Sequence, residues 1–298
     1  MPAALDYAIV DVFTTTALAG NPLAVVMNKA NLTTAQMQSV AREFNLSETT
    51  FVERRPAAVE AAEGVRVRIF TTQEELPFAG HPTLGTASVL KLTAPETLRD
   101  SVITLAENVG PIPVRFDNPD TLFGEMTQRD AEFGHELDPA EVARLCGLSL
   151  EDLDNSAAPQ VVSTGNGFAI VLLRSVDALA RLRVQHDEAT PFLRAHSGRW
   201  FYVLAAAQEE SGAKCFRARM QFNGAEDPAT GSAAGCAVAY LVQRNLAPSG
   251  LRFLIRQGVE MGRSSEIFVA AQASESGVGE IRVAGSTVLV AKGRLFLP

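Results

Sequence analysis

The sequence predicts an α+β protein with two pseudo-symmetric halves, each a β-sheet or barrel wrapped around one central apolar helix. The first observation behind this prediction is a repeated segment. ELPFAGHPTLGTA, which begins at Glu75, resembles EDPATGSAAGCA, which begins at Glu226. Aligning Gly80 with Gly231 pairs these two glutamates, and both segments then continue into an apolar run with helical character. Helices that are apolar on all sides are expected to be enclosed rather than to lie on a surface.

Two further similarities keep the same order along the chain. The spacing that aligns these segments also aligns two arginines in each half, which are Arg66 with Arg217 and Arg68 with Arg219. Upstream, GNPLAVV from Gly20 matches GNGFAIV from Gly165. Landmarks repeated in order favour an internal duplication over chance similarity between glycine-rich turns. We therefore expect an N-terminal half, residues 1–124, and a C-terminal half, residues 125–298, and leave open whether the last strand returns to the first half.

Composition excludes several classes of protein. A chain of 298 residues with 47% hydrophobic residues is long enough for two domains with substantial cores. Its net charge of -8 disfavours nucleic acid as a partner, because the overall field repels phosphate groups. The apolar runs are shorter than the roughly 20 residues of a membrane-spanning helix, and the N-terminus does not resemble a secretion signal. We expect a cytoplasmic protein that does not bind membranes.

Cysteine and histidine usage points away from disulfides and metals. Three widely spaced cysteines occur, Cys146, Cys215 and Cys236, and they make neither a disulfide framework nor a zinc site. The four histidines are not paired with other metal ligands at suitable spacing. The sequence also lacks a dinucleotide fingerprint and a phosphate-binding loop. We therefore expect no metal, and the use of a nucleotide is unsupported.

The N-terminal half begins with a predicted strand at residues 6–13, which a loop connects to a second strand at 22–28. A helix is predicted over residues 32–44, capped by Thr33 or Thr34 and ended by Asn45. The next strand begins near Ser47, and a strictly alternating strand at 65–70 leads into the first repeated segment.

Within that segment, Pro82 is expected at the first helical position, where a residue without an N–H is tolerated. His81 would then be the N-cap of a buried helix near residues 82–92. The N–H groups at such a helix start can bind a carboxylate or phosphate.

The C-terminal half is expected to repeat this arrangement. Ser232 takes the N-cap position of a second apolar helix, near residues 232–245, and serine is favoured there. If a pseudo-twofold relates the halves, the two helix N-termini face each other across a cleft and hold one small anion, which is a hypothesis at this stage.

Four side chains could carry chemistry: Glu48 and His81 from the first half, and Asp227 and Ser232 from the second. A carboxylate with a nearby imidazole and hydroxyl suits removal of a proton next to an activated carbon and its return elsewhere. Partial burial would raise the pKa of such a glutamate toward the working pH. Alternatives remain open, because Glu48 could be a solvated residue at a strand edge and His81 a capping residue without chemistry.

The segments DVFTTTALAGNPLAVV, LSETTFV, ELPFAGHPTLGTA and EDPATGSAAG, spread over most of the chain, strongly resemble the phenazine biosynthesis PhzF-like family. The resemblance implies the diaminopimelate epimerase fold and a homodimer. It implies a cofactor-independent isomerase resembling trans-2,3-dihydro-3-hydroxyanthranilate isomerase. It also implies a proton-carrying role for Glu48, catalytic roles for His81, Asp227 and Ser232, and binding of a substrate carboxylate by the N–H groups of Gly80 and Gly231.

Two departures from related patterns bear on function. Racemases of this fold use one cysteine from each half, but neither repeated turn contains one, so two-thiol racemisation is not expected. The loop TTQEEL has Thr72 where the family often has proline, which affects loop shape and substrate identity. We expect an isomerase that moves a proton between carbons of a small, cyclic, carboxylate-bearing substrate. The alternatives are a non-catalytic binding or interaction protein and a thiol-independent epimerase.

Overall fold

The computed structural model describes residues 3–209, 211–212, 214–222, 225–275 and 277–297. The chain divides into two compact units, the first formed by Met1–Thr127 and Ala284–Pro298 and the second by Gln128–Val283. The predicted boundary at 124/125 therefore lies slightly before the observed one. The predicted C-terminal half also included residues 284–298, with the return of the last strand left open, whereas these residues belong to the first unit.

The first unit is built mainly of strands. These are β1 (Ala3–Val12), β2 (Asn21–Met27), β3 (Glu48–Glu53), β4 (Val65–Phe70), β5 (Glu75–Leu76), β6 (Val102–Glu107), β7 (Gly110–Arg115), β8 (Gly124–Thr127) and β19 (Thr287–Leu297). Its helices are α1 (Thr34–Phe44), α2 (Ala57–Glu63), α3 (Gly80–Thr93) and the short η1 (Pro95–Thr97). Antiparallel and parallel pairings alternate from β1 to β6, since β1–β2 and β3–β4 are antiparallel while β2–β3 and β4–β6 are parallel.

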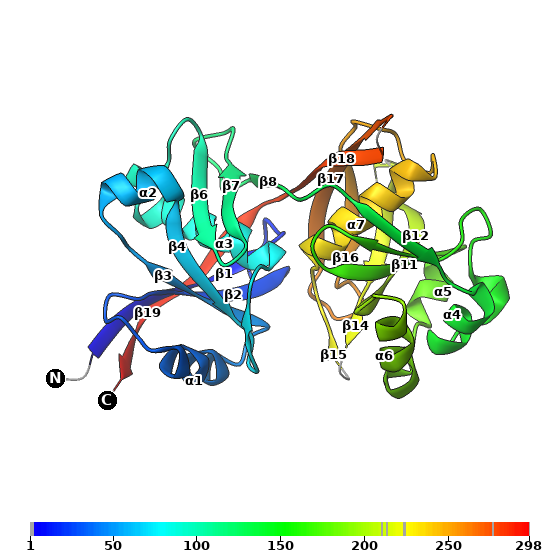
Figure 1. Cartoon of the computed structure of the whole chain (residues 1–298), viewed down its shortest axis with the longest axis horizontal. Coiled ribbons are helices and arrows are strands. Elements are labelled where there is room, and N and C mark those ends of the chain that lie inside the picture. Colours follow the sequence, from blue (N-terminus) through cyan, green and yellow to red (C-terminus); the bar gives the residue numbers. More distant parts are fainter. Residues whose placement is uncertain (1–2, 210, 213, 223–224, 276, 298) are drawn as a thin grey trace. The chain divides into compact units, whose positions relative to one another are not determined.

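Helix α3 forms the centre of the first unit, with the sheet around it (Figure 1). Every residue from Gly80 to Leu90 is buried, as predicted for a helix without a polar face. The sheet approaches the helix backbone closely at Gly85, because a Cβ there would lie 2.7 Å from the Leu23 side chain and 2.8 Å from that of Val12. A larger residue at this position would push the helix away from β1 and β2.

The second unit contains β9 (Glu132–Glu136), β10 (Gln160–Ser163), β11 (Gly167–Leu173), β12 (Trp200–Gln208), β13 (Lys214–Arg219), β14 (Gln221–Phe222), β15 (Ala225–Glu226), β16 (Phe253–Gln257), β17 (Ser265–Ser274) and β18 (Gly277–Gly285), whose last residues pass into the first unit. Its helices are α4 (Pro139–Leu145), η2 (Leu150–Asp152), α5 (Val176–Ala180), α6 (His186–Ala195) and α7 (Gly231–Gln243). None of the described helices is long and apolar enough to cross a membrane.

The second unit repeats the pairing order of the first. Strands β10–β11 and β12–β13 are antiparallel, while β11–β12 and β13–β16 are parallel. Helix α7 follows the β14–β15 hairpin as α3 follows β5, and its residues from Ala233 to Val242 are all buried. The α+β prediction of two similar halves around apolar helices is confirmed.

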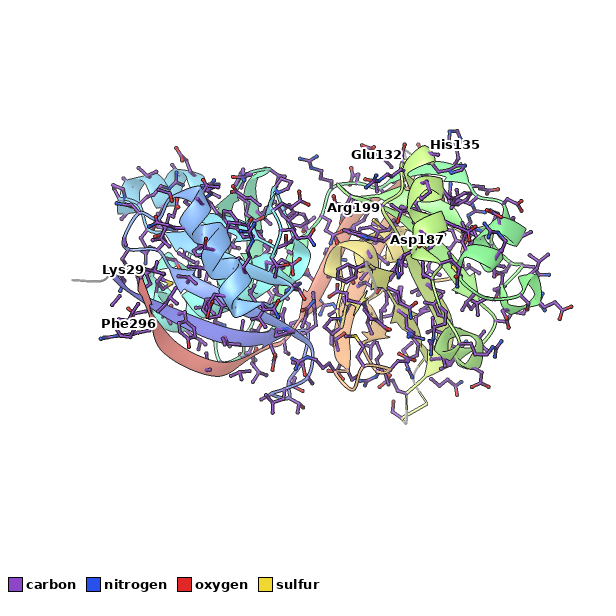
Figure 2. The ribbon with its side chains drawn as sticks, turned by 90° about the horizontal axis from the view of Figure 1, so that it is seen from below. Lys29, Glu132, His135, Asp187, Arg199 and Phe296 are labelled. Atoms are coloured by element: carbon purple, nitrogen blue, oxygen red, sulfur yellow. The ribbon has the colours of Figure 1, made fainter. Side chains whose placement is uncertain are left out.

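Each unit is closed by a strand that arrives from elsewhere in the chain. Strand β19 runs antiparallel to β1, with Ala3 opposite Leu297, so the two ends of the described chain lie side by side (Figure 1). Strand β9 pairs with β10 in the corresponding way. Phe296, near the end of β19, is exposed at the surface of the first unit (Figure 2).

The starts of the two central helices differ from the prediction. The N-caps are Ala79 and Thr230 rather than His81 and Ser232, so each helix begins at its glycine. His81 and Ser232 are both second helical residues. Pro82 fits because the N–H groups of the whole first turn lack acceptors within the helix, not only that of the first residue. The same register in both helices agrees with duplication.

Candidate active site

Glu48 and His81 come together in the first unit. Glu48 is the first residue of β3, and His81 lies in the first turn of α3. Glu48 Oε2 lies 3.4 Å from His81 Nε2, and the two side chains are only 16% and 6% exposed. This separation is longer than the roughly 2.7–3.2 Å of a normal hydrogen bond. The two groups are therefore in contact without a short bond between them.

The local fold explains why Glu48 reaches this position. Thr50 lies two residues after Glu48 and therefore on the same face of β3. The Thr50 Oγ1 lies 2.8 Å from Thr86 Oγ1 in a buried hydrogen bond that fixes β3 against α3. Strand β3 is also held by parallel pairing with β2, in which Leu23 is opposite Glu48.

His81 is a neutral imidazole at physiological pH. Burial lowers its pKa to about 3, because the charged form cannot be solvated there. Its contact with Glu48 is within ion-pair distance, yet without a charged imidazole it is not an ion pair at pH 7. A carboxylate can only accept, so the Nε2 atom that faces it carries the proton of the neutral ring.

The contact of Asn21 with the other ring nitrogen of His81 supports the same tautomer. Its Nδ2 lies 3.2 Å from His81 Nδ1, and Asn21 is fully buried. An amide nitrogen only donates, so Nδ1 is the acceptor and the tautomer is the same one that the carboxylate favours. Sequence reasoning did not select Asn21 as a site residue, although it lies in the Gly-Asn-Pro motif that revealed one of the repeats.

A second buried carboxyl, that of Glu107, lies at the same end of α3. Thr83 Oγ1 is 2.7 Å from Glu107 Oε1 and 2.7 Å from the Ala79 carbonyl oxygen. A hydroxyl has a single proton to donate, so both contacts are hydrogen bonds only if Glu107 carries a proton. Burial raises the pKa of Glu107 to about 8, with the Thr83 hydrogen bond and Arg66 opposing the shift, which agrees with a neutral carboxyl at pH 7. Sequence analysis missed this residue.

The predicted site residues of the second unit lie at the start of α7. Asp227 is buried in the loop after β15, and its backbone N–H donates to the Met220 carbonyl at 3.0 Å. Its Oδ2 accepts a hydrogen bond of 2.6 Å from Thr230 Oγ1. Ser232 is partly exposed in the first turn of α7, at the position that His81 takes in α3.

The two glycines expected to bind a carboxylate begin the two central helices. Gly80 is the first residue of α3 and Gly231 the first residue of α7. Backbone N–H groups in a first helical turn have no acceptor within the helix and carry the positive end of the helix dipole. Each glycine therefore has the placement that anion binding requires.

The cysteines do not supply a nucleophile or a base. All three are buried, and burial raises the pKa of Cys146 to about 12 and that of Cys236 to about 11. The pKa of Cys215 rises to about 11, first through burial and then through Glu209. A thiolate is therefore strongly disfavoured at each position.

The carboxylate–imidazole contact suits proton transfer at carbon. A buried carboxylate is poorly solvated and can take a proton from an activated C–H group that reaches it. The neutral imidazole cannot serve as a cationic acid at pH 7, but its Nε2–H can hydrogen-bond the carboxylate or a bound molecule.

Comparison with known proteins agrees with this chemistry. The family profile described as phenazine biosynthesis-like protein (PhzC-PhzF) matches residues 10–293. The chain is 35% identical to the trans-2,3-dihydro-3-hydroxyanthranilate isomerase of Pseudomonas aeruginosa, with 98% of this chain and 99% of that protein covered.

Two solved structures are similar. One, described as a predicted epimerase from Pseudomonas aeruginosa, is 33% identical with a TM-score of 0.80 and coverage of 97% and 98%. The other, a PhzF-family protein from Bacillus anthracis, is 24% identical with a TM-score of 0.85 and coverage of 98% and 99%. The expectation of an isomerase is confirmed, and the chain belongs to the phenazine biosynthesis-like PhzC-PhzF family.

Proposed function

We propose that the protein is a cofactor-independent isomerase in which Glu48 moves a proton between two carbons of a small, cyclic, carboxylate-bearing substrate. The observation that carries this proposal is the buried contact between Glu48 Oε2 and His81 Nε2, 3.4 Å apart, at the start of α3. It places a carboxylate and a neutral imidazole in contact with each other beside a helix N-terminus.

In the proposed reaction, the Glu48 carboxylate takes a proton from a carbon next to an activating group. The electron pair of the broken C–H bond delocalises into the conjugated system of the substrate. The protonated Glu48 then returns the proton to a second carbon, and a double bond has moved. No proton or electron is gained or lost overall.

The remaining site residues position the substrate. His81 lies in contact with Glu48 and presents its Nε2–H to a bound molecule, while Asp227 and Ser232 offer an acceptor and a hydroxyl for polar groups of a substrate. The N–H groups of Gly80 and Gly231, each at the start of its own central helix, are proposed donors to a substrate carboxylate.

The first candidate substrate is trans-2,3-dihydro-3-hydroxyanthranilate. Support comes from the Pseudomonas aeruginosa relative, which is named for the isomerisation of this compound and is 35% identical over 297 residues. We further propose that the protein is a homodimer, which light scattering coupled to size-exclusion chromatography would test.

An epimerase that uses Glu48 and His81 as a two-base pair is less well supported. Such an enzyme needs each base in its protonated form in one of the two directions. A protonated His81 is strongly disfavoured, because burial holds its pKa near 3. Transfer by a single carboxylate does not require that state.

The test compares Glu48→Gln with a matched change on the same strand, Glu53→Gln, in deuterated water. Glu53 lies at the far end of β3, where it accepts a hydrogen bond from Asn28. With the candidate substrate, Glu48→Gln should lower kcat about 100- to 10,000-fold and abolish deuterium uptake at carbon. Calorimetry should show that binding is retained. Glu53→Gln should match the wild type.

The products separate the remaining alternatives. A moved double bond supports the isomerase, whereas inversion of a stereocentre without such a shift supports the epimerase. Normal turnover by Glu48→Gln would remove Glu48 from the mechanism. Binding without turnover by the wild type would favour a binding protein for this compound.

A further inference from the structure

Four buried polar side chains of the second unit form a connected group around Asp227. Tyr202 lies on β12 and Gln257 is the last residue of β16, while Asp227 and Thr230 belong to the loop that leads into α7. Tyr202 and Gln257 are completely buried, and Asp227 and Thr230 are nearly so. Buried polar groups of this kind require partners, so their hydrogen bonds define the geometry of the loop.

The amide of Gln257 can adopt only one orientation. Its Oε1 lies 3.0 Å from the Thr230 backbone nitrogen and 3.0 Å from the Tyr202 hydroxyl. Its Nε2 lies 2.7 Å from the Asp227 carbonyl oxygen. Because a backbone N–H only donates and a carbonyl only accepts, exchanging the amide oxygen and nitrogen would break both backbone bonds.

This orientation fixes the direction of the next bond. Gln257 Nε2 also donates to Thr230 Oγ1, at 2.9 Å. The Thr230 hydroxyl proton is therefore available for Asp227, whose Oδ2 lies 2.6 Å away. Hydrogen bonds then run in one direction, from Gln257 to Thr230 to Asp227, and the carboxylate is the terminal acceptor. A short bond from a hydroxyl to a carboxylate is among the stronger kinds in proteins.

The loop is also held on its other side. Ser265 Oγ donates 2.8 Å to the Pro228 carbonyl and lies 3.1 Å from the Gln257 carbonyl oxygen. The backbone of Gly258 has φ +75°, and a Cβ there would lie 2.7 Å from the Pro228 oxygen. The end of β16 therefore packs directly against the loop, and Gln257 cannot move without moving Asp227.

We infer that Gln257 and Thr230, supported by Tyr202, are positioning residues that hold the Asp227 carboxylate in one orientation as a hydrogen-bond acceptor for substrate binding and turnover. This inference rests on the proposed function, because it gives a role to residues behind Asp227. Tyr202 is a neighbouring titratable group, and burial raises its pKa well above the usual value, so it remains a neutral group near the carboxylate.

The test removes the hydroxyl that contacts Asp227 while keeping the side-chain shape. Thr230→Val should lower kcat/KM about 10- to 100-fold, since a hydrogen bond to a charged group is lost. The acidic limb of the pH profile should move to higher pH, because a carboxylate without its donor holds a proton more tightly. Thr230→Ser restores a hydroxyl and should recover both quantities.

A matched pair of tyrosine variants separates positioning from general loss of stability. Tyr202→Phe removes the donor to Gln257 and should lower kcat/KM about 2- to 10-fold, with the same direction of pH shift. Tyr240→Phe removes the hydroxyl of another fully buried tyrosine, which donates a hydrogen bond of 2.8 Å to the Ala158 carbonyl. It should leave kcat/KM and the pH profile unchanged. If Thr230→Val does not fold, the tyrosine pair decides the question.

Asp227→Asn distinguishes failure of this inference from failure of the proposed function. If Asp227→Asn has wild-type activity, the proposed role of Asp227 is wrong and the positioning inference falls with it. If Asp227→Asn is inactive while Thr230→Val or Tyr202→Phe keeps the wild-type kcat/KM and pH profile, only the positioning inference is overturned.

Discussion

The two units keep the same structural ion pair at the turn before the central helix. In the first unit, Arg68 binds Glu75 through two hydrogen bonds, of 2.8 Å and 2.5 Å. In the second, Arg219 binds Glu226 through two of 2.8 Å and 2.6 Å. These are the residues that the internal alignment of the sequence paired. The ion pair therefore belongs to the duplicated framework rather than to the chemistry of one site.

The units differ in the residue that ends the strand after the central helix. This residue is Glu107 on β6 in the first unit and Gln257 on β16 in the second. Both contact a threonine hydroxyl near a helix start, Thr83 and Thr230 respectively. A protonated carboxyl and an amide are both neutral and both can donate. At the end of this strand, both units therefore carry a group that can donate a hydrogen bond to a threonine hydroxyl. Only the carboxyl of Glu107 can respond to pH.

The largest expected effect comes from breaking the shared ion pair in the second unit. Arg219 is only 5% exposed, whereas Arg68 is 17% exposed. Glu226→Gln should destabilise the second unit by about 2–3 kcal/mol, because Arg219 loses the carboxylate that accepts two of its hydrogen bonds and is left with the Glu260 carboxylate at 4.0 Å. Glu75→Gln should cost the first unit less, on the order of 1–2 kcal/mol, since water reaches Arg68.

Each unit can be followed separately in urea. The single tryptophan, Trp200, lies on β12 and reports on the second unit by fluorescence. Hydrogen exchange of α3 amides reports on the first. Equal losses from the two variants would contradict the claim that burial, and not the ion pair itself, sets the cost.

A pH-dependent effect is expected from Glu107→Gln. The pKa of Glu107 is raised from an ordinary value of 4.5 to about 8 in the folded protein. The protonated Glu107 carboxyl therefore makes its full contribution to the free energy of unfolding below pH 4.5. This contribution is lost as the pH rises toward 8, at about 1.4 kcal/mol for each pH unit. Glutamine does not titrate, so the variant should lose this part of the pH dependence.

Hydrogen exchange of the first unit between pH 5 and pH 8, corrected for the intrinsic exchange rate, measures how its free energy of unfolding changes with pH. This change per pH unit is the slope. Glu43→Gln, an exposed change on α1, is the control and should keep the wild-type slope. A wild-type slope in Glu107→Gln would show that Glu107 is ionised in the folded protein at neutral pH.

Local sequence signals predicted the parts of the fold that local interactions determine. Thr33, one of the two predicted cap residues, caps α1 in a capping box with Gln36. The catalytic roles of Glu48 and His81 were implied by the family resemblance, because local signals alone left Glu48 as a possible solvated strand-edge residue and His81 as a possible capping residue. The spacing of the repeats also identified residues that hold equivalent positions in the two units. It did so without any knowledge of the contacts that these residues make.

The residues behind the site were not predictable in this way. Strand β16, which carries Gln257, lies in a short segment without strict alternation and was not predicted. Asn21 contacts His81, which is 60 residues away in the sequence, and Glu107 contacts Thr83, which is 24 residues away. Whether a polar side chain is buried beside a partner depends on tertiary packing, which periodicity alone does not specify. The start of α3 was misplaced because proline fits at several positions of a first turn, and that of α7 because serine is favoured as an N-cap and Ser232 was assigned that position.

The most direct measurement of the central claim follows one hydrogen atom. A substrate deuterated at the carbon that loses its proton should turn over more slowly with the wild type, and the label should leave that carbon as Glu48 removes it. Glu48→Gln should leave the label in place. Loss of the label at the wild-type rate in Glu48→Gln would show that another group moves the proton and would contradict the account.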